Sequence, residues 1–175
     1  MKILMIHKFH YIEGGAERYV FNLTDLLNLK GHEVVPFSMH HPDNADHRYQ
    51  RYFSSYFNPS QFAGTLAEIF KNSWRAIYNK EAREKLSDLI QDVQPDIAHV
   101  HSIYHHLSPA ILSVLKKNRL PVVMTLHDYK VICPNYILLD GNNCICEWWR
   151  RKPKSGDRLI FEKTEFDKSW FNCNG

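Results

Sequence analysis

The hydrophobic positions of the chain follow two alternating patterns. Short apolar runs alternate along the first 130 residues with segments whose apolar residues recur every three or four positions. Apolar runs of four to eight residues are typical of buried strands, and the longer period is typical of amphipathic helices. We therefore predict strands over residues 3–6, 33–38, 51–57, 96–101 and 121–126.

The segments between these runs predict helices. In the first, Ala16, Val20, Leu23 and Leu27 form one apolar stripe, and Gly31 ends the helix as a C-cap. Further helices are expected over 62–78, over 82–93, and from the N-cap Ser108 with Pro109 to the basic residues Lys116, Lys117 and Arg119.

Strands that alternate with helices at this spacing indicate right-handed crossovers between parallel strands. The expected fold is therefore a Rossmann-like, doubly wound α/β domain with a parallel sheet. We expect the strand over 3–6 to be central and to lie beside the strand over 96–101. In such a sheet, ligands bind beyond the carboxyl ends of the strands, where the strand order reverses.

Composition narrows the class of protein. The chain has 175 residues, of which 44% are hydrophobic and 23% charged, which fits a globular domain of ordinary size. A net charge of +3 does not favour nucleic acid as a partner. The first apolar run is too short for a signal peptide or a membrane span, so a cytoplasmic location is expected. The basic residues 150–154 fit either a peripheral membrane contact or a solvated loop.

The most informative local feature is a pair of glycines, Gly14 and Gly15, between the first strand and the first helix. Glycines let a ligand approach the backbone closely, and the amides at a helix start favour a phosphate or carboxylate. A tight turn without a ligand is the alternative. The Gly-x-Gly-x-x-Gly dinucleotide fingerprint and the Gly-Lys-Ser/Thr of a P-loop are both absent, so neither an NAD site nor a P-loop is supported.

Polar residues also follow two later strands. His101 ends the strand over 96–101, and His127 with Asp128 follows the last strand. Each histidine alone is compatible with a structural role, but three loops that meet at one edge of the sheet favour a site. His99 and His101 share a face of their strand, yet a third ligand is not apparent nearby, so a catalytic zinc is weakly supported.

Four stretches together resemble the amino-terminal half of the family-four retaining glycosyltransferases, which have the two-domain GT-B fold. They are Gly14-Gly15-Ala16-Glu17-Arg18, the segment from Asn22 to Val34, Pro95-Asp96-Ile97-Ala98-His99-Val100-His101, and Thr125-Leu126-His127-Asp128-Tyr129. The resemblance covers roughly residues 2–147, and the ordered set is more specific than any one motif.

The resemblance implies a role for each matching residue. Gly14 and Gly15 would contact the diphosphate of the nucleotide-sugar donor, and His127 would lie at the transferred sugar as the catalytic residue. His101, Glu17 and Asp128 would line the site of the hydroxyl acceptor. The family's reaction needs no cofactor, and none is expected here.

The resemblance also sets expectations for the domains. Residues 1–149 would form the acceptor-binding domain and 150–175 an irregular charged and aromatic tail. The family's carboxyl-terminal, donor-binding domain has no counterpart in these 175 residues, so this chain alone is expected to fold but not to transfer sugar. The rival hypothesis is a non-catalytic module that binds a carbohydrate or a partner.

The cysteines depart from the family pattern. Members with His-Asp-Tyr-Lys-x-x-Cys-Pro-Asn tend to carry a Cys-x-x-Cys pair next, and here Trp149 stands where the second thiol of that pair would be. We therefore expect reduced thiols or a loosely held metal, with no defined metal site. Tetrahedral zinc remains the alternative for the four cysteines, which are Cys133, Cys144, Cys146 and Cys173.

Overall fold

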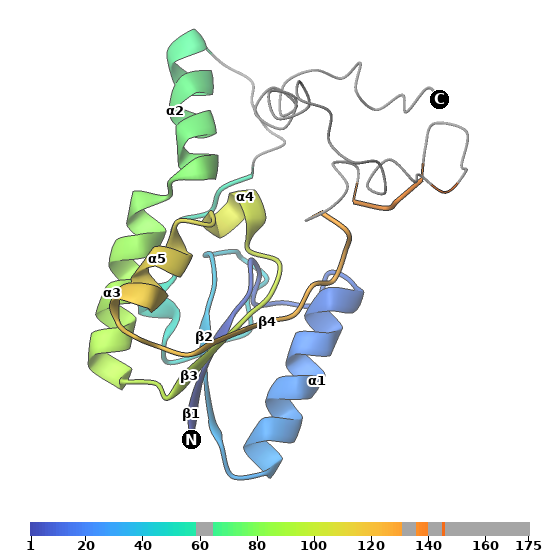
Figure 1. Ribbon diagram of the computed structural model, residues 1–175, viewed down its shortest axis with the longest axis vertical. Helices are drawn as coiled ribbons and strands as arrows, with labels where there is room; N and C mark the ends of the chain where they lie inside the picture. Colours follow the sequence, from blue (N-terminus) through green and yellow to red (C-terminus); the bar gives the residue numbers. More distant parts are fainter. Residues whose placement is uncertain (59–64, 131–135, 140–144, 146–175) are drawn as a thin grey trace, which may run out of the picture. The chain divides into compact units, whose positions relative to one another are not determined.

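The computed structural model describes residues 1–58, 65–130, 136–139 and 145. The chain divides into two compact units, Met1–Thr125 and Leu126–Gly175, and each is described by itself. The helices and strands named below all belong to the first unit (Figure 1). The predicted domain boundary at residue 149 lies outside the described residues, and so do the four cysteines and the basic residues 150–154.

The elements of the first unit alternate as expected for an α/β domain. In chain order they are β1 (Lys2–Ile6), α1 (Gly15–Leu29), β2 (Glu33–Phe37), the 3-10 helix η1 (Gln50–Tyr52), α2 (Leu66–Ile77), α3 (Lys80–Val93), β3 (Ile97–Val100), α4 (Tyr104–Leu107), α5 (Ile111–Lys117) and β4 (Val122–Met124).

The four strands form one parallel sheet in the order β2-β1-β3-β4. In β1, Ile3 pairs with Val34 on one side and with Ile97 on the other. The prediction that β1 is central and lies next to β3 is therefore confirmed. Because β2 is added on one side of β1 and β3 on the other, the strand order reverses between β1 and β3, which is where a doubly wound sheet binds its ligand.

The two faces of β1 pack against different helices, because successive side chains of a strand point to opposite faces of the sheet. Leu4 and Ile6 are fully buried in the main core, which α3 and α5 complete. On the other face, Met5 packs with Val20 of α1, and the partly buried Leu23 and Leu27 extend this contact. Figure 1 shows α1 on one side of the sheet and α3 with α5 on the other. The predicted doubly wound fold is confirmed.

Helix α1 ends where its glycine permits a reversal of the chain. Gly31 has a φ of +78°, the left-handed region that a residue with a Cβ rarely adopts. The amide of Gly31 donates to the Asn28 carbonyl at 2.9 Å, and that of His32 donates to the Leu27 carbonyl at 3.0 Å. These two bonds form a Schellman motif, which confirms Gly31 as the terminator and turns the chain into β2.

The predicted strand over 51–57 is wrong. Residues Gln50–Tyr52 form η1, and Ser54 makes an isolated parallel bridge with Met39, which lies beyond the end of β2. The aromatic residues that suggested a strand are used for packing instead, since Phe53 and Phe57 are buried. High β-propensity often reflects side-chain packing more than backbone pairing, and here packing is satisfied without a ladder.

The predicted N-cap at Ser108 is also wrong. Helix α5 begins at Ile111, and the cap position is Ala110. Ser108 instead has a φ of +65°, and its hydroxyl accepts the backbone N–H of Asn79 at 3.0 Å. The serine therefore joins two segments of the domain and does not start a helix.

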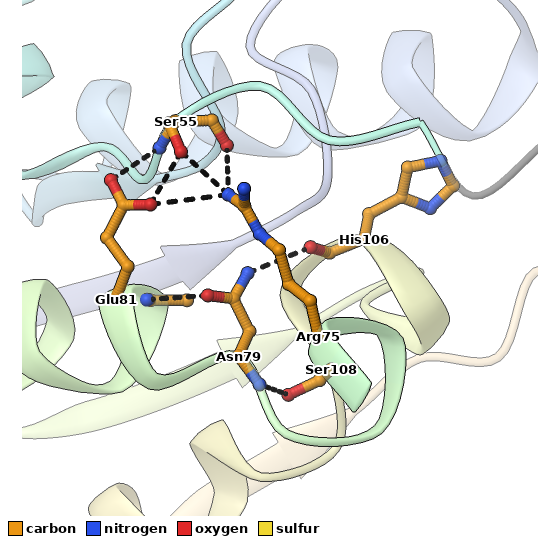
Figure 2. Close-up of polar contacts among 7 residues, drawn as sticks. Ser55, Arg75, Asn79, Glu81, His106 and Ser108 are labelled. Atoms are coloured by element: carbon orange, nitrogen blue, oxygen red, sulfur yellow. Dashed lines mark hydrogen bonds and ion pairs between the residues drawn. The ribbon is translucent and has the colours of Figure 1, made fainter. Parts of the chain in front are cut away.

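A polar network at the start of α3 fixes the surrounding loops (Figure 2). The Asn79 side chain accepts the Ala82 amide at 3.0 Å as the N-cap of α3, and it donates to the His106 carbonyl at 3.3 Å. Arg75 of α2 donates to the Ser55 carbonyl and hydroxyl and pairs with Glu81 at 3.2 Å. The Glu81 carboxylate accepts the backbone N–H of Ser55 at 2.8 Å.

The pKa of Glu81 reflects this network. Partial burial alone would raise the pKa of its carboxyl group, but the hydrogen bonds from Ser55 and the charge of Arg75 hold the pKa below its ordinary value. The carboxylate is therefore ionised at neutral pH and keeps Ser55 in place.

The described residues of the second unit make local contacts. The amide of Tyr129 donates to the Tyr136 carbonyl at 3.1 Å, and Leu139 forms an antiparallel bridge with Ile145. Among the helices that the structure describes, none combines the length and the apolar composition that crossing a membrane requires.

Asn79→Ala is expected to lower the free energy of unfolding by about 2 kcal/mol, because the cap is lost and two buried backbone groups lose a partner. Urea unfolding followed by circular dichroism measures the change. Asn28→Ala on the exposed side of α1 is the control, with an expected change within about 0.5 kcal/mol. Equal losses in the two variants would contradict the structural role of Asn79.

Candidate functional site

Two buried histidines lie at the carboxyl ends of the central strands. His7 directly follows β1 and is 3% exposed, and His101 directly follows β3 and is fully buried. The amide of His7 donates to the Phe37 carbonyl at 3.2 Å, and that of His101 donates to the Ile6 carbonyl at 2.8 Å. The sheet hydrogen bonding therefore continues through both residues and places them side by side at the switch point.

The imidazole rings form a row that reaches α1. The ring centroids of His7 and His101 are 6.4 Å apart, and those of His101 and His99 are 4.1 Å apart. Tyr19 of α1 lies 6.0 Å from the His101 ring. His99 Nε2 is 2.7 Å from the Thr125 hydroxyl. The predicted shared face of His99 and His101 is confirmed, and several imidazole rings gather at this edge.

The glycine turn is held by a buried carboxylate. Glu17 lies in the first turn of α1 and is 4% exposed. Its Oε2 accepts the backbone N–H of Gly14 at 2.9 Å, as the third helical residue of a capping box does. Its Oε1 lies 3.5 Å from His7 Nε2 and 3.9 Å from Lys8 Nζ. The Glu17 side chain thus contacts the turn at Gly14, His7 at the end of β1, and the cation of Lys8.

The turn itself is open to solvent. Gly14 and Gly15 are both exposed, and a Cβ added at Gly15 would have no atom within 4 Å. The first amides of a helix have no partner within the helix, and the macrodipole places partial positive charge there. The glycine turn before the first helix is therefore accessible from solvent, and the binding of an anion there stays a prediction.

Two further histidines near the turn are held neutral. Burial, with smaller effects of His47 and His7, lowers the pKa of His10 to about 4, and its ring stacks on Phe21 at 5.2 Å. Burial, with smaller effects of Lys8, His105 and His7, lowers the pKa of His106 to about 4. Both rings are therefore uncharged at neutral pH.

His127 and Asp128 belong to the second unit, which is described by itself. Asp128 Oδ1 accepts the backbone N–H of Lys130 at 2.9 Å, a local turn that orients the carboxylate. The grouping of these two residues with the Gly14 turn and His101 stays a prediction.

Sequence reasoning missed His7, Lys8 and His10. All three lie in the loop after β1, and the signal that selected His101, a histidine directly after a predicted strand, applies equally to His7. Glu17 was selected only through the family motif, and its burial was not foreseen. Within the described part of the chain, no group of three or more histidine, cysteine, aspartate or glutamate side chains could hold a metal ion.

Comparison with known proteins adds a family to this geometry. The family model of Glycosyltransferase Family 4 matches residues 13–161. A similar protein is an uncharacterized 42.6 kDa protein in cps region of Klebsiella pneumoniae, which is 30% identical over 145 residues. The alignment covers 77% of this chain and 39% of the relative, so the chain spans well under half of the relative's length.

The lowered pKa values of His10 and His106 predict a loss of stability in acid. Between pH 6.5 and about 4 the unfolded histidines bind protons that the folded ones do not, so the free energy of unfolding falls as pH falls. Each histidine should contribute roughly 2 kcal/mol to this loss between about pH 7 and pH 4.5. Denaturant unfolding at several pH values measures it.

The matched variant is His10→Phe, which keeps a flat ring against Phe21 but does not titrate. Its loss of stability over the same pH range should be smaller than that of the unmodified chain by about 2 kcal/mol. An identical pH dependence in both proteins would contradict the neutral state of His10.

Proposed function

We propose a sugar-transfer function for this chain, which belongs to glycosyltransferase family 4. The reaction moves a sugar from a nucleotide-sugar donor to a hydroxyl acceptor with retention of configuration. The Rossmann-like domain forms the acceptor side of the enzyme and contributes backbone contacts to the donor. A second, donor-binding domain completes the site.

The observation that carries this proposal is the open glycine turn held by Glu17 beside the buried histidines of β1 and β3. Its position at the switch point of a parallel sheet is where such folds bind ligands. An exposed helix start and a cluster of hydrogen-bonding rings suit a reaction in which a diphosphate leaves and a hydroxyl attacks.

On the donor side, the turn at Gly14 and Gly15 binds the diphosphate through the amides at the start of α1, while the Gly14 amide itself donates to Glu17. Negative charge on the diphosphate increases as the bond to the sugar breaks, and amides at the positive end of α1 stabilise that charge. Glu17 fixes the turn in advance through the Gly14 amide, so the amides need not reorganise during the reaction.

On the acceptor side, family membership assigns acceptor-binding roles to His101 of the first unit, to Asp128 of the second unit, and to Glu17, which contacts His7 and Lys8. His127 lies at the transferred sugar and is the catalytic residue, because an imidazole hydrogen bond positions the sugar as its bond to the leaving group weakens. We assign these roles by family membership and by position after the strands.

We also propose a cellular role and location for this chain. The name of the Klebsiella relative places that protein in a cps region, which supports a role for this chain in polysaccharide biosynthesis. The proposed location is the cytoplasm. Residues 150–154 would provide a peripheral contact with the membrane. The 175-residue chain alone should fold without transferring sugar, because a closed, water-poor cleft needs the donor-binding domain as its second wall.

The rival function is a non-catalytic module that binds a carbohydrate or a partner. It shares the acceptor side with the enzyme and differs at the glycine turn, since a module without a donor has no use for a diphosphate. Binding of an anion at Gly15 therefore separates the two functions.

Gly15→Val is expected to weaken binding of inorganic pyrophosphate by roughly tenfold or more, because a branched side chain would cover the amides of the turn. Calorimetric titration of the chain measures the dissociation constant. The fold should tolerate the change, since the space around Gly15 is open. Asn28→Val, on the exposed side of α1, is the control, and equal affinities in the two variants would count against the donor role of the turn.

His127→Ala is expected to lower the rate of transfer by about 100-fold in a protein that carries this chain with its donor-binding domain. The free energy of unfolding should change by less than about 0.5 kcal/mol. Initial rates with a panel of nucleotide sugars and saccharide acceptors measure the first quantity, and His32→Ala, directly before β2, is the control. If the variant unfolds and regains activity when stabilised elsewhere, His127 is structural.

A further inference from the structure

A cluster of aromatic rings lies in the loops that follow β1 and β2. Burial raises the pKa of its Tyr11, and Glu17 is near enough for its carboxylate to contribute to that shift. Phe9 and Tyr11 come from the loop after β1, His41 from the loop after β2, and Tyr56 from the stretch after η1. Tyr11 stacks on His41 with ring centroids 4.5 Å apart and planes at 21°, and Tyr56 lies 5.4 Å from His41. Phe9 packs beneath at 5.0 Å from Tyr11 and 6.0 Å from His41. We call these four residues the aromatic shelf.

The shelf presents ring surface to solvent. Tyr56 is 44% exposed and Tyr11 is half-buried, whereas Phe9 is buried and supports them. Aromatic faces left exposed at the edge of a candidate site are available to a ligand that is itself flat and partly apolar.

The polar groups beside the shelf include an exposed carboxylate and a neutral phenol. Asp43 Oδ2 lies 3.5 Å from His41 Nδ1, and the Asp43 side chain is 71% exposed. Burial, together with Glu13, Tyr56 and Asp43, raises the pKa of Tyr11, so its phenol stays neutral and able to donate. A carboxylate accepts hydrogen bonds from hydroxyl groups and repels phosphates.

The loops under the shelf are fixed by several bonds. The amide of Ala45 donates to the His10 carbonyl at 2.9 Å, and the amide of His10 donates to Asn44 Oδ1 at 3.2 Å. The Asn44 amide group in turn donates to the Met39 carbonyl at 2.8 Å. The loop after β1 and the loop after β2 are therefore tied together, which holds the ring of Tyr11 against that of His41.

The network of Figure 2 supports the other two sides of the shelf. Glu81 and Arg75 converge on Ser55, the residue before Tyr56. Asn79 holds the carbonyl of His106, whose ring meets Phe9 edge-on at 5.7 Å. A recognition surface needs such support, because rings held in place lose little entropy when a ligand binds.

We propose that the aromatic shelf binds a pyranose ring, and hence that the acceptor of the proposed reaction is a saccharide. The apolar C–H face of the sugar stacks on the exposed ring of Tyr56, with Tyr11 beside it, and its hydroxyl groups donate to Asp43 and pair with His41. The identification of this sugar as the acceptor rests on the proposed function. The binding of a pyranose to the shelf does not depend on sugar transfer.

The charge beside the shelf favours a sugar over a nucleobase. A nucleobase would also stack on the rings, but it would bring the phosphates of its nucleotide toward Asp43. A neutral ring with several hydroxyl groups matches both the stacking surface and the carboxylate.

The test is saturation-transfer NMR on the chain with methyl β-glucopyranoside, methyl β-galactopyranoside and methyl α-mannopyranoside as probes. At least one pyranoside should receive saturation on its ring C–H protons, whereas the open-chain polyol sorbitol should not. No pyranoside signal at tens of millimolar, or a stronger signal from uridine monophosphate than from every pyranoside, would overturn the proposal.

Variants locate the binding. Tyr56→Ala should weaken pyranoside binding roughly tenfold, the loss expected for one stacked ring, and Tyr56→Phe should retain it. Asp43→Asn should weaken binding several-fold while the stacking remains. Tyr78→Ala, at an exposed tyrosine beyond the end of α2, is the control. Equal affinity in Tyr56→Ala and the unmodified chain would overturn the proposal.

The outcomes also separate this proposal from the proposed function. Pyranoside binding that depends on Tyr56, in a protein without transferase activity, would support the shelf and favour the carbohydrate-binding module. Transfer with an acceptor KM that Tyr56→Ala leaves unchanged would support the enzyme and overturn the shelf.

Discussion

The position of β1 is the constraint on which the rest of this domain depends. It is paired on both edges, by β2 and β3, and covered on both faces, by α1 and by the core under α3 and α5. A strand enclosed in this way must consist of apolar residues along its length. Polar residues stand at its two ends, where the exposed Lys2 begins the strand and His7 directly follows it.

The polar groups beyond that end are buried as a set. Glu17 would be costly inside the domain alone, but the Gly14 amide, His7 and Lys8 surround its carboxylate. The turn that we propose to bind a diphosphate is thus fixed by the carboxylate of Glu17. This arrangement leaves Gly15 exposed, while the amide of the neighbouring Gly14 is held by Glu17. A fixed residue and an accessible residue are therefore adjacent in the turn.

Sequence patterns predicted the sheet because parallel strands and amphipathic helices leave strong periodic signals, as in residues 3–6 and the stripe from Ala16 to Leu27. They failed at 51–57, where aromatic residues pack without pairing. They also failed at Ser108, whose hydroxyl has a partner 29 residues away. The aromatic shelf was not predicted, since its rings come from three loops that only the tertiary fold brings together.

The long stretch of sequence between β1 and its partner β3 has a consequence for the synthesis of the chain on the ribosome. Bonds that tie the start of β1 to the start of β3 join residues 94 positions apart, such as the Lys2 amide and Asp96. At about 5 to 20 residues per second on the ribosome, one edge of β1 stays unpaired for several seconds after it emerges. The strand that organises the finished sheet is therefore an exposed apolar edge in the nascent chain, and its protection there is a task for chaperones.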